Sequence, residues 1–121
     1  MKMIPQAVDA IIVHLIEHNY LNEERFACAF VRGKFRIKKW GKLRLERELK
    51  MREISSYSIK KAFEEIDESE YLKTLDHLVL KRVAQEKEKN SYKKRKKVAD
   101  YLLYRGWESH LVYEKLLEYI K

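Results

Sequence analysis

Eight apolar positions between residues 26 and 66 recur as apolar positions 53 residues later, without a gap. The pairs are Phe26/Val79, Phe30/Val83, Leu45/Val98, Leu49/Leu102, Ile54/Trp107, Ile59/Val112, Phe63/Leu116 and Ile66/Tyr119. Two basic positions, Lys42 and Arg44, match Arg95 and Lys97 in the same register. A fixed period of this length is typical of supersecondary units that stack in tandem to bury a shared core. The repeat therefore predicts two copies of one structural unit.

Each copy has the apolar spacing of three helices. In the first copy we predict a helix over 22–38, capped by Asn22, a helix over 41–52 and a third helix after the break at 54–56. We expect the first helix to bury Phe26, Phe30, Gly33 and Ile37, with Gly33 allowing either a close approach of another helix or a kink. In the helix over 41–52 we expect Leu45 and Leu49 to point inward and the ion pairs Glu46–Lys50 and Arg44–Glu48 to form.

In the second copy, acidic residues at 67, 68 and 70 favour a helix start, and Ser91 can cap the next helix. Gly106 stands where a left-handed residue would end that helix. The chain has only three Gly and one Pro, too few for the frequent turns of an all-β fold. The fold class we predict is all-α, with tandem three-helix, helix-turn-helix-like repeats in an elongated and curved arrangement.

Residues 5–18 form one further apolar stripe at helical spacing, with Val8, Ile11, Ile12, Leu15 and Ile16. By the repeat spacing this helix corresponds to the third helix of an earlier unit. We therefore divide the chain into 1–19, the last helix of an incomplete first repeat; 20–67, the central repeat; and 68–121, the C-terminal repeat. We expect a monomer, with helix 5–18 as the surface for self-association if its stripe is uncovered.

The basic residues are concentrated in the first copy. The net charge is +8, of which residues 23–66 carry +6, and seven Lys or Arg without an acid lie between Arg32 and Arg44. Such an excess suggests an acidic partner, either nucleic acid or an acidic protein surface, although a solubilising face has the same composition. The basic tract 93–97 wraps more than one helical turn, so its members cannot all face one ligand. Among the tyrosines, which could stack on bases, we expect only Tyr92 and Tyr104 to be free.

Nothing in the sequence indicates catalysis, a metal site or a cofactor. His14 and His18 have metal-ligand spacing but lack a third ligand nearby, and Cys28 between phenylalanines is typical of a small buried thiol. The glycines occur singly, so there is no phosphate-binding loop. We expect a non-enzymatic protein without cofactors. The sequence has neither a signal peptide nor an apolar run of membrane length, so we expect no membrane association and a cytoplasmic location.

The central copy resembles a known family. The segments that carry the resemblance are 20–27 (YLNEERFA), 29–32 (AFVR), Trp40-Gly41, Arg44-Leu45, Glu48-Leu49 and Ile54-Ser55, which are similar in order and spacing to the central repeat of the RecX family. These bacterial proteins regulate the RecA recombinase. The similarity is specific over about 20–66 and looser over 67–121, and the chain lacks most of the family's first repeat.

The resemblance implies tandem three-helix repeats and a function without catalysis. It implies binding to the RecA–DNA filament, with inhibition or modulation of the recombinase in DNA repair, recombination and the SOS response. DNA itself, single- or double-stranded, would be bound weakly and without sequence preference. The candidate contacts to RecA or DNA are the basic residues Arg25, Arg32, Lys34, Arg36, Lys38, Lys39, Lys42, Arg44, Arg47, Lys93, Arg95 and Lys97, with Arg25, Arg32 and Arg44 matching recurrent basic positions of the family.

Two departures from the family pattern concern special backbone positions. Glu53 replaces the Gly that commonly precedes Ile54, and Lys39 and Lys42 replace the Gly and Pro that often flank Trp40-Gly41. The alternative hypothesis is a stand-alone helical DNA-binding module. In that case the helix over 41–52 would act as a recognition helix, with Arg44 and Arg47 one turn apart.

Overall fold

The computed structural model describes residues 22–120, and these residues form helices joined by short connections. A helix over 22–33 continues as the π-helix η1 (Lys34–Lys38) and is followed by α2 (Lys42–Met51), α3 (Ser56–Phe63), α4 (Glu68–Gln85), α5 (Ser91–Tyr104) and α6 (Ser109–Tyr119). No strand occurs within residues 22–120, so the all-α prediction is confirmed. The predicted helix 5–18, with His14 and His18, lies outside the described residues.

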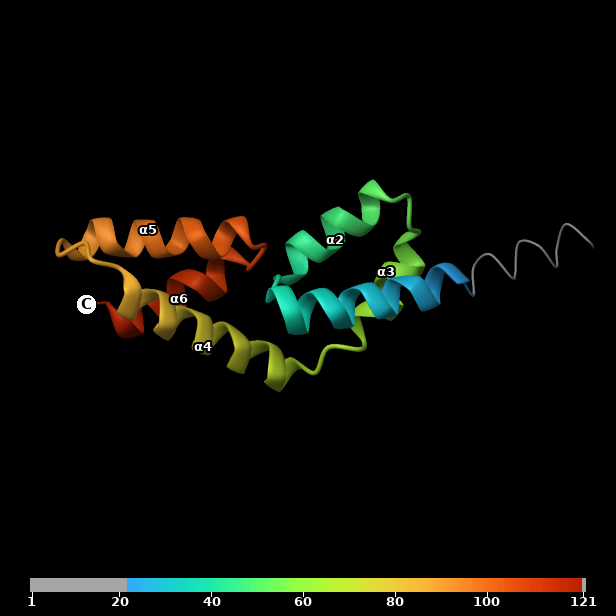
Figure 1. Ribbon diagram of the computed structural model, residues 1–121, viewed down its shortest axis with the longest axis horizontal. Helices are drawn as coiled ribbons and strands as arrows, with labels where there is room; N and C mark the ends of the chain where they lie inside the picture. The colour runs from blue at the N-terminus through green and yellow to red at the C-terminus, as the bar shows by residue number, and fades with distance from the viewer. Residues whose placement is uncertain (1–21, 121) are drawn as a thin grey trace, which may run out of the picture.

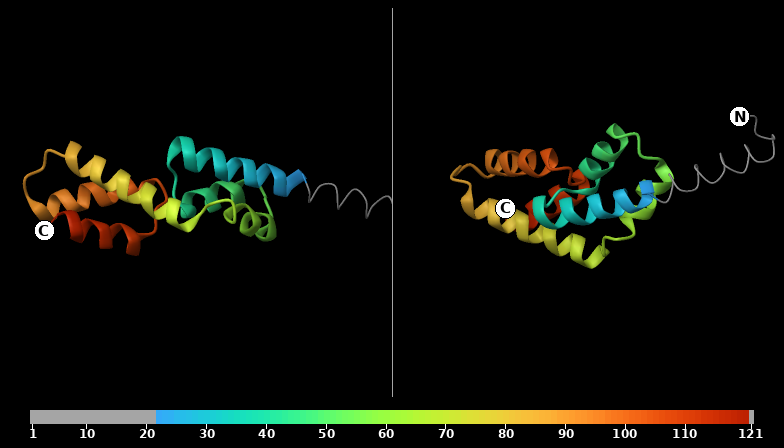
Figure 2. Two further views of the ribbon diagram at one scale, coloured as in Figure 1. Left: turned by 90° about the horizontal axis from the view of Figure 1, so that it is seen from below. Right: turned by 45° about the vertical axis from the view of Figure 1, so that its right-hand side comes forward.

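The helices of residues 22–120 form two groups, which lie end to end and give this part of the chain an elongated shape (Figure 1). The first unit, residues 22–66, contains helix 22–38, α2 and α3, and the second unit, residues 67–120, contains α4, α5 and α6. Figure 2 shows the same division from two further directions, with α4 carrying the chain from one group into the other. In the second unit all three helices pack on one another, and in the first unit α2 packs on α3.

Among the described residues, α3, α4 and α5 begin at a side-chain cap. The Ser55 hydroxyl accepts from Ser58 N at 3.2 Å, the Asp67 carboxylate accepts from Glu70 N at 3.1 Å, and the Asn90 amide oxygen accepts from Lys93 N at 3.0 Å. Each cap satisfies one amide of the first turn, which has no partner within its helix. The prediction that Ser91 caps α5 was wrong, because Asn90 can cap equally well and the helix starts one residue earlier.

One apolar core runs through both units. Its centre is a group of three aromatic rings from three segments, Phe35, Tyr71 and Trp107. The distances between ring centroids are 5.8 Å for Phe35 and Tyr71, 6.5 Å for Phe35 and Trp107, and 4.5 Å for Tyr71 and Trp107. Phe35 belongs to the first unit and the other two rings to the second. Aromatic pairs at these separations add to the free energy gained by burying the rings themselves. The two units are therefore joined by core packing as well as by the chain.

The first helix buries a different face from the one predicted. Ala27, Val31 and Phe35 are buried, whereas Phe26 is 45% exposed and Ile37 is 77% exposed. Both faces carry apolar residues at helical spacing, and the rings of the second unit cover the one that holds Phe35. Nothing lies within 4 Å of a Cβ built on Gly33, so the predicted close approach of a helix there was wrong. Instead, the α-helix gives way to the π-helix η1 directly after Gly33.

This change of face also corrects the repeat register. Buried Leu45 and Leu49 correspond to buried Val98 and Leu102 at the offset of 53. In the first helix of each unit, the equivalent core positions are Ala27/Leu75, Val31/Val79 and Phe35/Val83, at an offset of 48. The second unit thus has five more residues between its first and second helices. The predicted pairs Phe26/Val79 and Phe30/Val83 were wrong for that reason.

The two units meet at Gly41 and Gly106. A Cβ on Gly41 would lie 2.4 Å from the Gly106 carbonyl oxygen, and one on Gly106 would lie 2.3 Å from the Arg44 Cβ. Gly106 also has φ +92°, a left-handed conformation that favours glycine. Its partner in the repeat, Glu53, has φ 60°, so the left-handed position expected from the sequence is found in both units. Only glycine at 41 and 106 permits so close a backbone contact.

Hydrogen bonds hold this joint together. Gly41 N donates to Arg105 O at 2.9 Å, Leu43 N donates to Gly106 O at 3.0 Å, and the Trp107 Nε1 donates to Lys39 O at 3.0 Å. The buried Tyr71 hydroxyl accepts from Lys42 N at 2.9 Å and donates to the Glu108 carboxylate. Burial and the bond to Glu108 raise the pKa of Tyr71, which keeps the phenol protonated. These hydrogen bonds fix the position of one unit relative to the other.

Candidate nucleic-acid interface

The basic stretch 32–44 covers the end of the first helix, η1, the connection over residues 39–41 and the start of α2. Because the chain reverses direction within this stretch, its cations do not share one helix face. Lys34, Lys39, Lys42 and Arg44 are partly buried, and Arg32, Arg36 and Lys38 are exposed. Position in the sequence alone therefore does not tell which of these cations act together.

Two cations of this stretch, Lys34 and Arg44, and Arg52 at the end of α2 form a connected series with aromatic rings. Measured to ring centroids, Lys34 Nζ is 5.8 Å from Phe30 and 5.2 Å from Trp40, Arg44 Cζ is 4.2 Å from Trp40 and 5.1 Å from Tyr104, and Arg52 Cζ is 4.8 Å from Phe30. We call this series the cation–aromatic ladder: Arg52, Phe30, Lys34, Trp40, Arg44 and Tyr104. Cations over ring faces at such distances are attracted by the ring quadrupole. The ladder begins in the first unit and ends on α5 of the second.

Two further arginines extend the basic surface into the second unit. Arg82 Cζ and Arg105 Cζ lie 4.4 Å and 4.8 Å from the centroid of Tyr101. Arg105 Nη1 also donates to Lys38 O, at 2.6 Å, at the end of η1. Sequence reasoning missed both arginines, and it missed Arg52. The repeat contained a signal for one of them, because Arg52 and Arg105 stand at equivalent positions 53 residues apart, each directly before a left-handed residue.

Most of these cations are not neutralised by acids. Within residues 22–120, no carboxylate forms an ion pair with Lys34, Arg44, Arg82 or Arg105. Arg44 contacts instead two rings and, through Nη1, the Tyr104 carbonyl oxygen at 3.5 Å. The predicted Arg44–Glu48 pair was wrong, because Glu48 binds Arg52 at 3.0 Å. Aromatic faces hold the guanidinium groups in place without removing their charge, so this region keeps its attraction for anions.

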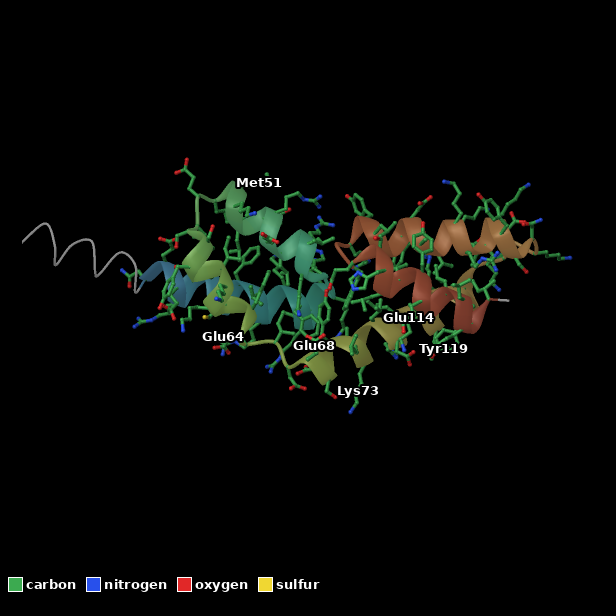
Figure 3. The ribbon with its side chains drawn as sticks, turned by 180° about the vertical axis from the view of Figure 1, so that it is seen from behind. Met51, Glu64, Glu68, Lys73, Glu114 and Tyr119 are labelled. Carbon is green, nitrogen blue, oxygen red and sulfur yellow. The ribbon has the colours of Figure 1, made fainter. Side chains whose placement is uncertain are left out.

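Other candidate residues have different surroundings. Lys42 Nζ forms an ion pair with Glu68 at 3.1 Å and also lies over the Tyr71 ring, 4.5 Å from its centroid. Lys39 adopts φ 58° at the end of η1, and its carbonyl accepts from Trp107, so it has a structural role. Figure 3 shows Glu68, the partner of Lys42, together with Glu64 at the long edge opposite Met51. The predicted Glu46–Lys50 pair is confirmed, at 2.8 Å.

The remaining candidates are not part of the ladder. On α5, Lys97 Nζ lies 3.4 Å from Glu88 and 4.0 Å from Glu86, and Arg95 Nη1 donates to Ile120 O at 3.1 Å. Lys93 is exposed near the start of the same helix. Arg25 and Arg47 are exposed on the first helix and on α2. The structure thus groups Lys34 and Arg44 with the unpredicted Arg52, Arg82 and Arg105, and leaves the other candidates apart.

Two other kinds of chemical site, a metal cluster and an activated cysteine, do not occur among the described residues. Among residues 22–120, no group of three His, Cys, Asp or Glu side chains could hold a metal ion. Burial raises the pKa of the Cys28 thiol, and the nearby Glu65 carboxylate raises it further, so this cysteine carries little thiolate at neutral pH. Over the same range, every helix is too short or too polar to span a lipid bilayer.

The two units match two successive domains of one protein family. Residues 22–62 match the second three-helix domain of RecX, and residues 68–116 match the third three-helix domain. The chain is 31% identical over 121 residues to the regulatory protein RecX of Yersinia enterocolitica, covering 94% of this chain and 68% of that protein. It is 33% identical over 105 residues to the regulatory protein RecX of Yersinia pseudotuberculosis, covering 85% and 55%.

A third relative lies in a different bacterial group. The regulatory protein RecX of Lactobacillus gasseri is 35% identical over 66 residues, which are 54% of this chain and 24% of that protein. No solved structure matches the chain. The domain matches cover both units in the order in which the family carries them, and the similarity to the Yersinia enterocolitica protein extends across the joint. The chain therefore belongs to the RecX family of regulatory proteins.

Proposed function

We propose that this protein binds the RecA–DNA filament and restrains its activity, as a cytoplasmic regulator without catalysis. Membership of the RecX family supports a regulatory role. The observation that carries the proposal furthest is the cation–aromatic ladder, which continues from the first unit into the second and retains uncompensated positive charge. A filament of protein on DNA presents phosphates and acidic side chains, and such a surface attracts a basic surface at long range.

The rigidity of the joint supports binding to an extended target. Backbone hydrogen bonds at Gly41 and Gly106 and the rings of Phe35, Tyr71 and Trp107 hold both units in one arrangement. A ligand that contacts both units therefore does not have to order them first, and binding loses less conformational entropy. An elongated and preorganised body suits a filament groove better than a small, isolated ligand.

We assign the contacts by charge and exposure. Lys34, Arg44 and Arg105 come first because they lie at the joint without an acidic partner among the described residues. The exposed Arg25, Arg32, Arg36, Lys38 and Arg47 add long-range attraction. The remaining candidates contribute less to binding, because most of them already have structural or ionic partners. These candidates are Lys39, Lys42, Lys93, Arg95 and Lys97.

The alternative, a stand-alone DNA-binding module with α2 as its recognition helix, has less support. The first turn of α2 is covered by the second unit, since Lys42 N donates to Tyr71 and Leu43 N donates to Gly106. Recognition helices contact bases with their N-terminal residues, which here are occupied. Arg44 is partly buried with its guanidinium over two rings, whereas Arg47 is exposed, so the two arginines have different surroundings.

ATP hydrolysis by RecA assembled on single-stranded DNA tests the proposal. We expect the wild-type protein to lower the rate, and the double variant Lys34→Gln/Arg44→Gln to require about tenfold more protein for the same effect, which corresponds to about 1.4 kcal/mol. The matched control is Lys50→Gln/Lys61→Gln, which removes two charges from the same unit at residues that are paired with Glu46 and Glu64. If the wild-type protein leaves hydrolysis unchanged at saturating concentration, the proposed function is wrong.

A further inference from the structure

Tyr104 is an exposed aromatic side chain at the joint between the units. It is the last residue of α5 and is 73% exposed. The Arg44 guanidinium lies 5.1 Å from the centroid of its ring, and Arg44 Nη1 donates to the Tyr104 carbonyl oxygen. The residue is thus held next to a cation from the other unit while most of its ring reaches solvent. Core packing does not explain an aromatic ring in this position.

Arg105, the next residue, provides an adjacent cation. Its guanidinium lies over Tyr101 and donates one hydrogen bond to Lys38 O, and Arg82 lies over the same Tyr101 ring. A guanidinium has five N–H donors. A single carbonyl bond and a ring contact leave most of the Arg105 donors available, and no carboxylate within residues 22–120 pairs with this group.

The combination of exposed ring and unpaired guanidinium groups is suited to one class of ligand. Proteins that bind single-stranded nucleic acids combine aromatic rings, on which bases stack, with cations that follow the phosphate backbone. A duplex contains the same phosphates but keeps its base faces stacked inside the helix. An acidic peptide would account for the cations and leave the exposed ring without a role.

We propose that Tyr104, Arg44 and Arg105 form a site for single-stranded nucleic acid, in which a base stacks on Tyr104 and the flanking phosphates bind the two arginines. Arg82, whose guanidinium also lies over Tyr101, strengthens the positive potential. The site uses residues of both units and therefore depends on the joint that holds them together. It deepens the proposed function, on which it rests for its biological setting, by naming the strand form that the chain contacts.

The first test measures binding of fluorescently labelled oligothymidylate and of a duplex of equal length, by anisotropy and without RecA. We expect Tyr104→Ala to weaken binding of the single strand about tenfold and binding of the duplex less than twofold, because base stacking contributes about 1–3 kcal/mol per base. Tyr104→Phe keeps the ring and should bind like the wild-type protein. The matched control is Tyr57→Ala, which removes a ring that is 62% exposed and lies under Lys61 in the first unit, and it should change nothing.

The second test separates phosphate contacts from general attraction. We expect Arg105→Gln to reduce the dependence of log affinity on log salt concentration by about 0.7 for the single strand, which corresponds to one phosphate contact. Lys115→Gln removes a charge that is already paired with Asp76 and should leave the slope unchanged.

Three results would overturn the site: no binding of the single strand by the wild-type protein, wild-type affinity in Tyr104→Ala, or equal losses for single strand and duplex in that variant. The outcome is independent of the proposed function. If Tyr104→Ala loses the single strand while the wild-type protein has no effect on ATP hydrolysis by RecA, the site stands and the proposed function fails. If the wild-type protein inhibits RecA and Tyr104→Ala binds the single strand normally, the proposed function stands and the site fails.

Discussion

The two units share a three-helix plan but differ in how many large side chains they bury, and some of their basic residues have different surroundings. In the second unit, Lys97 and Lys115 lie beside carboxylates, and the core includes large fully buried side chains such as Leu75, Leu102 and Trp107. In the first unit, Lys34 and Arg44 lie on aromatic rings, and large apolar side chains such as Phe26 and Ile37 remain exposed. The second unit thus holds most of the large, fully buried side chains among the described residues, and Lys34 and Arg44 of the first unit keep their charge over rings.

The surroundings of a cation decide how much it can contribute to binding an anion. A cation that is paired with an acid contributes little to binding an anion, since the pair is already neutral. A cation placed over a ring keeps its charge and loses some side-chain freedom before any ligand arrives. We therefore expect variants that damage packing to be more harmful in the second unit, and variants that remove charge to be more harmful at the joint and in the first unit.

We expect the largest effect on stability at Trp107, and a much smaller effect at Ile54, the equivalent position of the first unit. Trp107 is fully buried against Tyr71 and Phe35 and donates to Lys39 O, whereas Ile54 is only partly buried. We expect Trp107→Ala to lower the free energy of unfolding by about 3–5 kcal/mol and Ile54→Ala by about 1 kcal/mol. Urea denaturation followed by circular dichroism measures both. Equal losses would show that the two units are packed equally well.

We expect smaller changes in stability when either of two glycines of the first unit is replaced by alanine, and the two changes should have opposite signs. Gly41→Ala places a methyl group 2.4 Å from the Gly106 carbonyl oxygen, so the backbone at the joint must move, at a cost of about 2–3 kcal/mol. Gly33→Ala meets nothing within 4 Å at φ −67° and should instead stabilise the protein by about 0.5–1 kcal/mol. Thermal unfolding gives the two shifts, and small-angle scattering reports whether Gly41→Ala opens the joint. A stable and unchanged Gly41→Ala protein would contradict the close contact.

The smallest effect concerns the left-handed position that ends the middle helix of each unit. Gly106 adopts it without a side chain, whereas Glu53 adopts φ 60° with one. Glu53→Gly should therefore raise the free energy of unfolding by about 0.5–1 kcal/mol, because an L-residue is strained in this conformation. Glu53→Ala retains the Cβ and should give no such gain. A stability lower in Glu53→Gly than in the wild-type protein would indicate that the Glu53 side chain has a role of its own.

Several features of this protein could be derived from local sequence because their causes are local. Helical spacing predicted that Leu45 and Leu49 are buried, and the spacing of Glu46 and Lys50 predicted their ion pair. Left-handed backbone at 53 and 106 follows from the way a helix ends. Periodicity likewise determined the all-α class, since an amphipathic pattern specifies a helix whatever its neighbours are.

Other features depended on residues far apart in the sequence. Helix 22–38 has two apolar faces, and only the contacts of Phe35 with Tyr71 and Trp107 decide which one is buried. Lys42 is neutralised by Glu68, which lies 26 residues away, while Arg105 reaches the Lys38 carbonyl across 67 residues. A periodic pattern describes one element at a time, whereas burial and charge neutralisation are properties of pairs of elements. For that reason the sequence by itself determined the helices and their repeat, and only the tertiary structure decided which cations remain available to a partner.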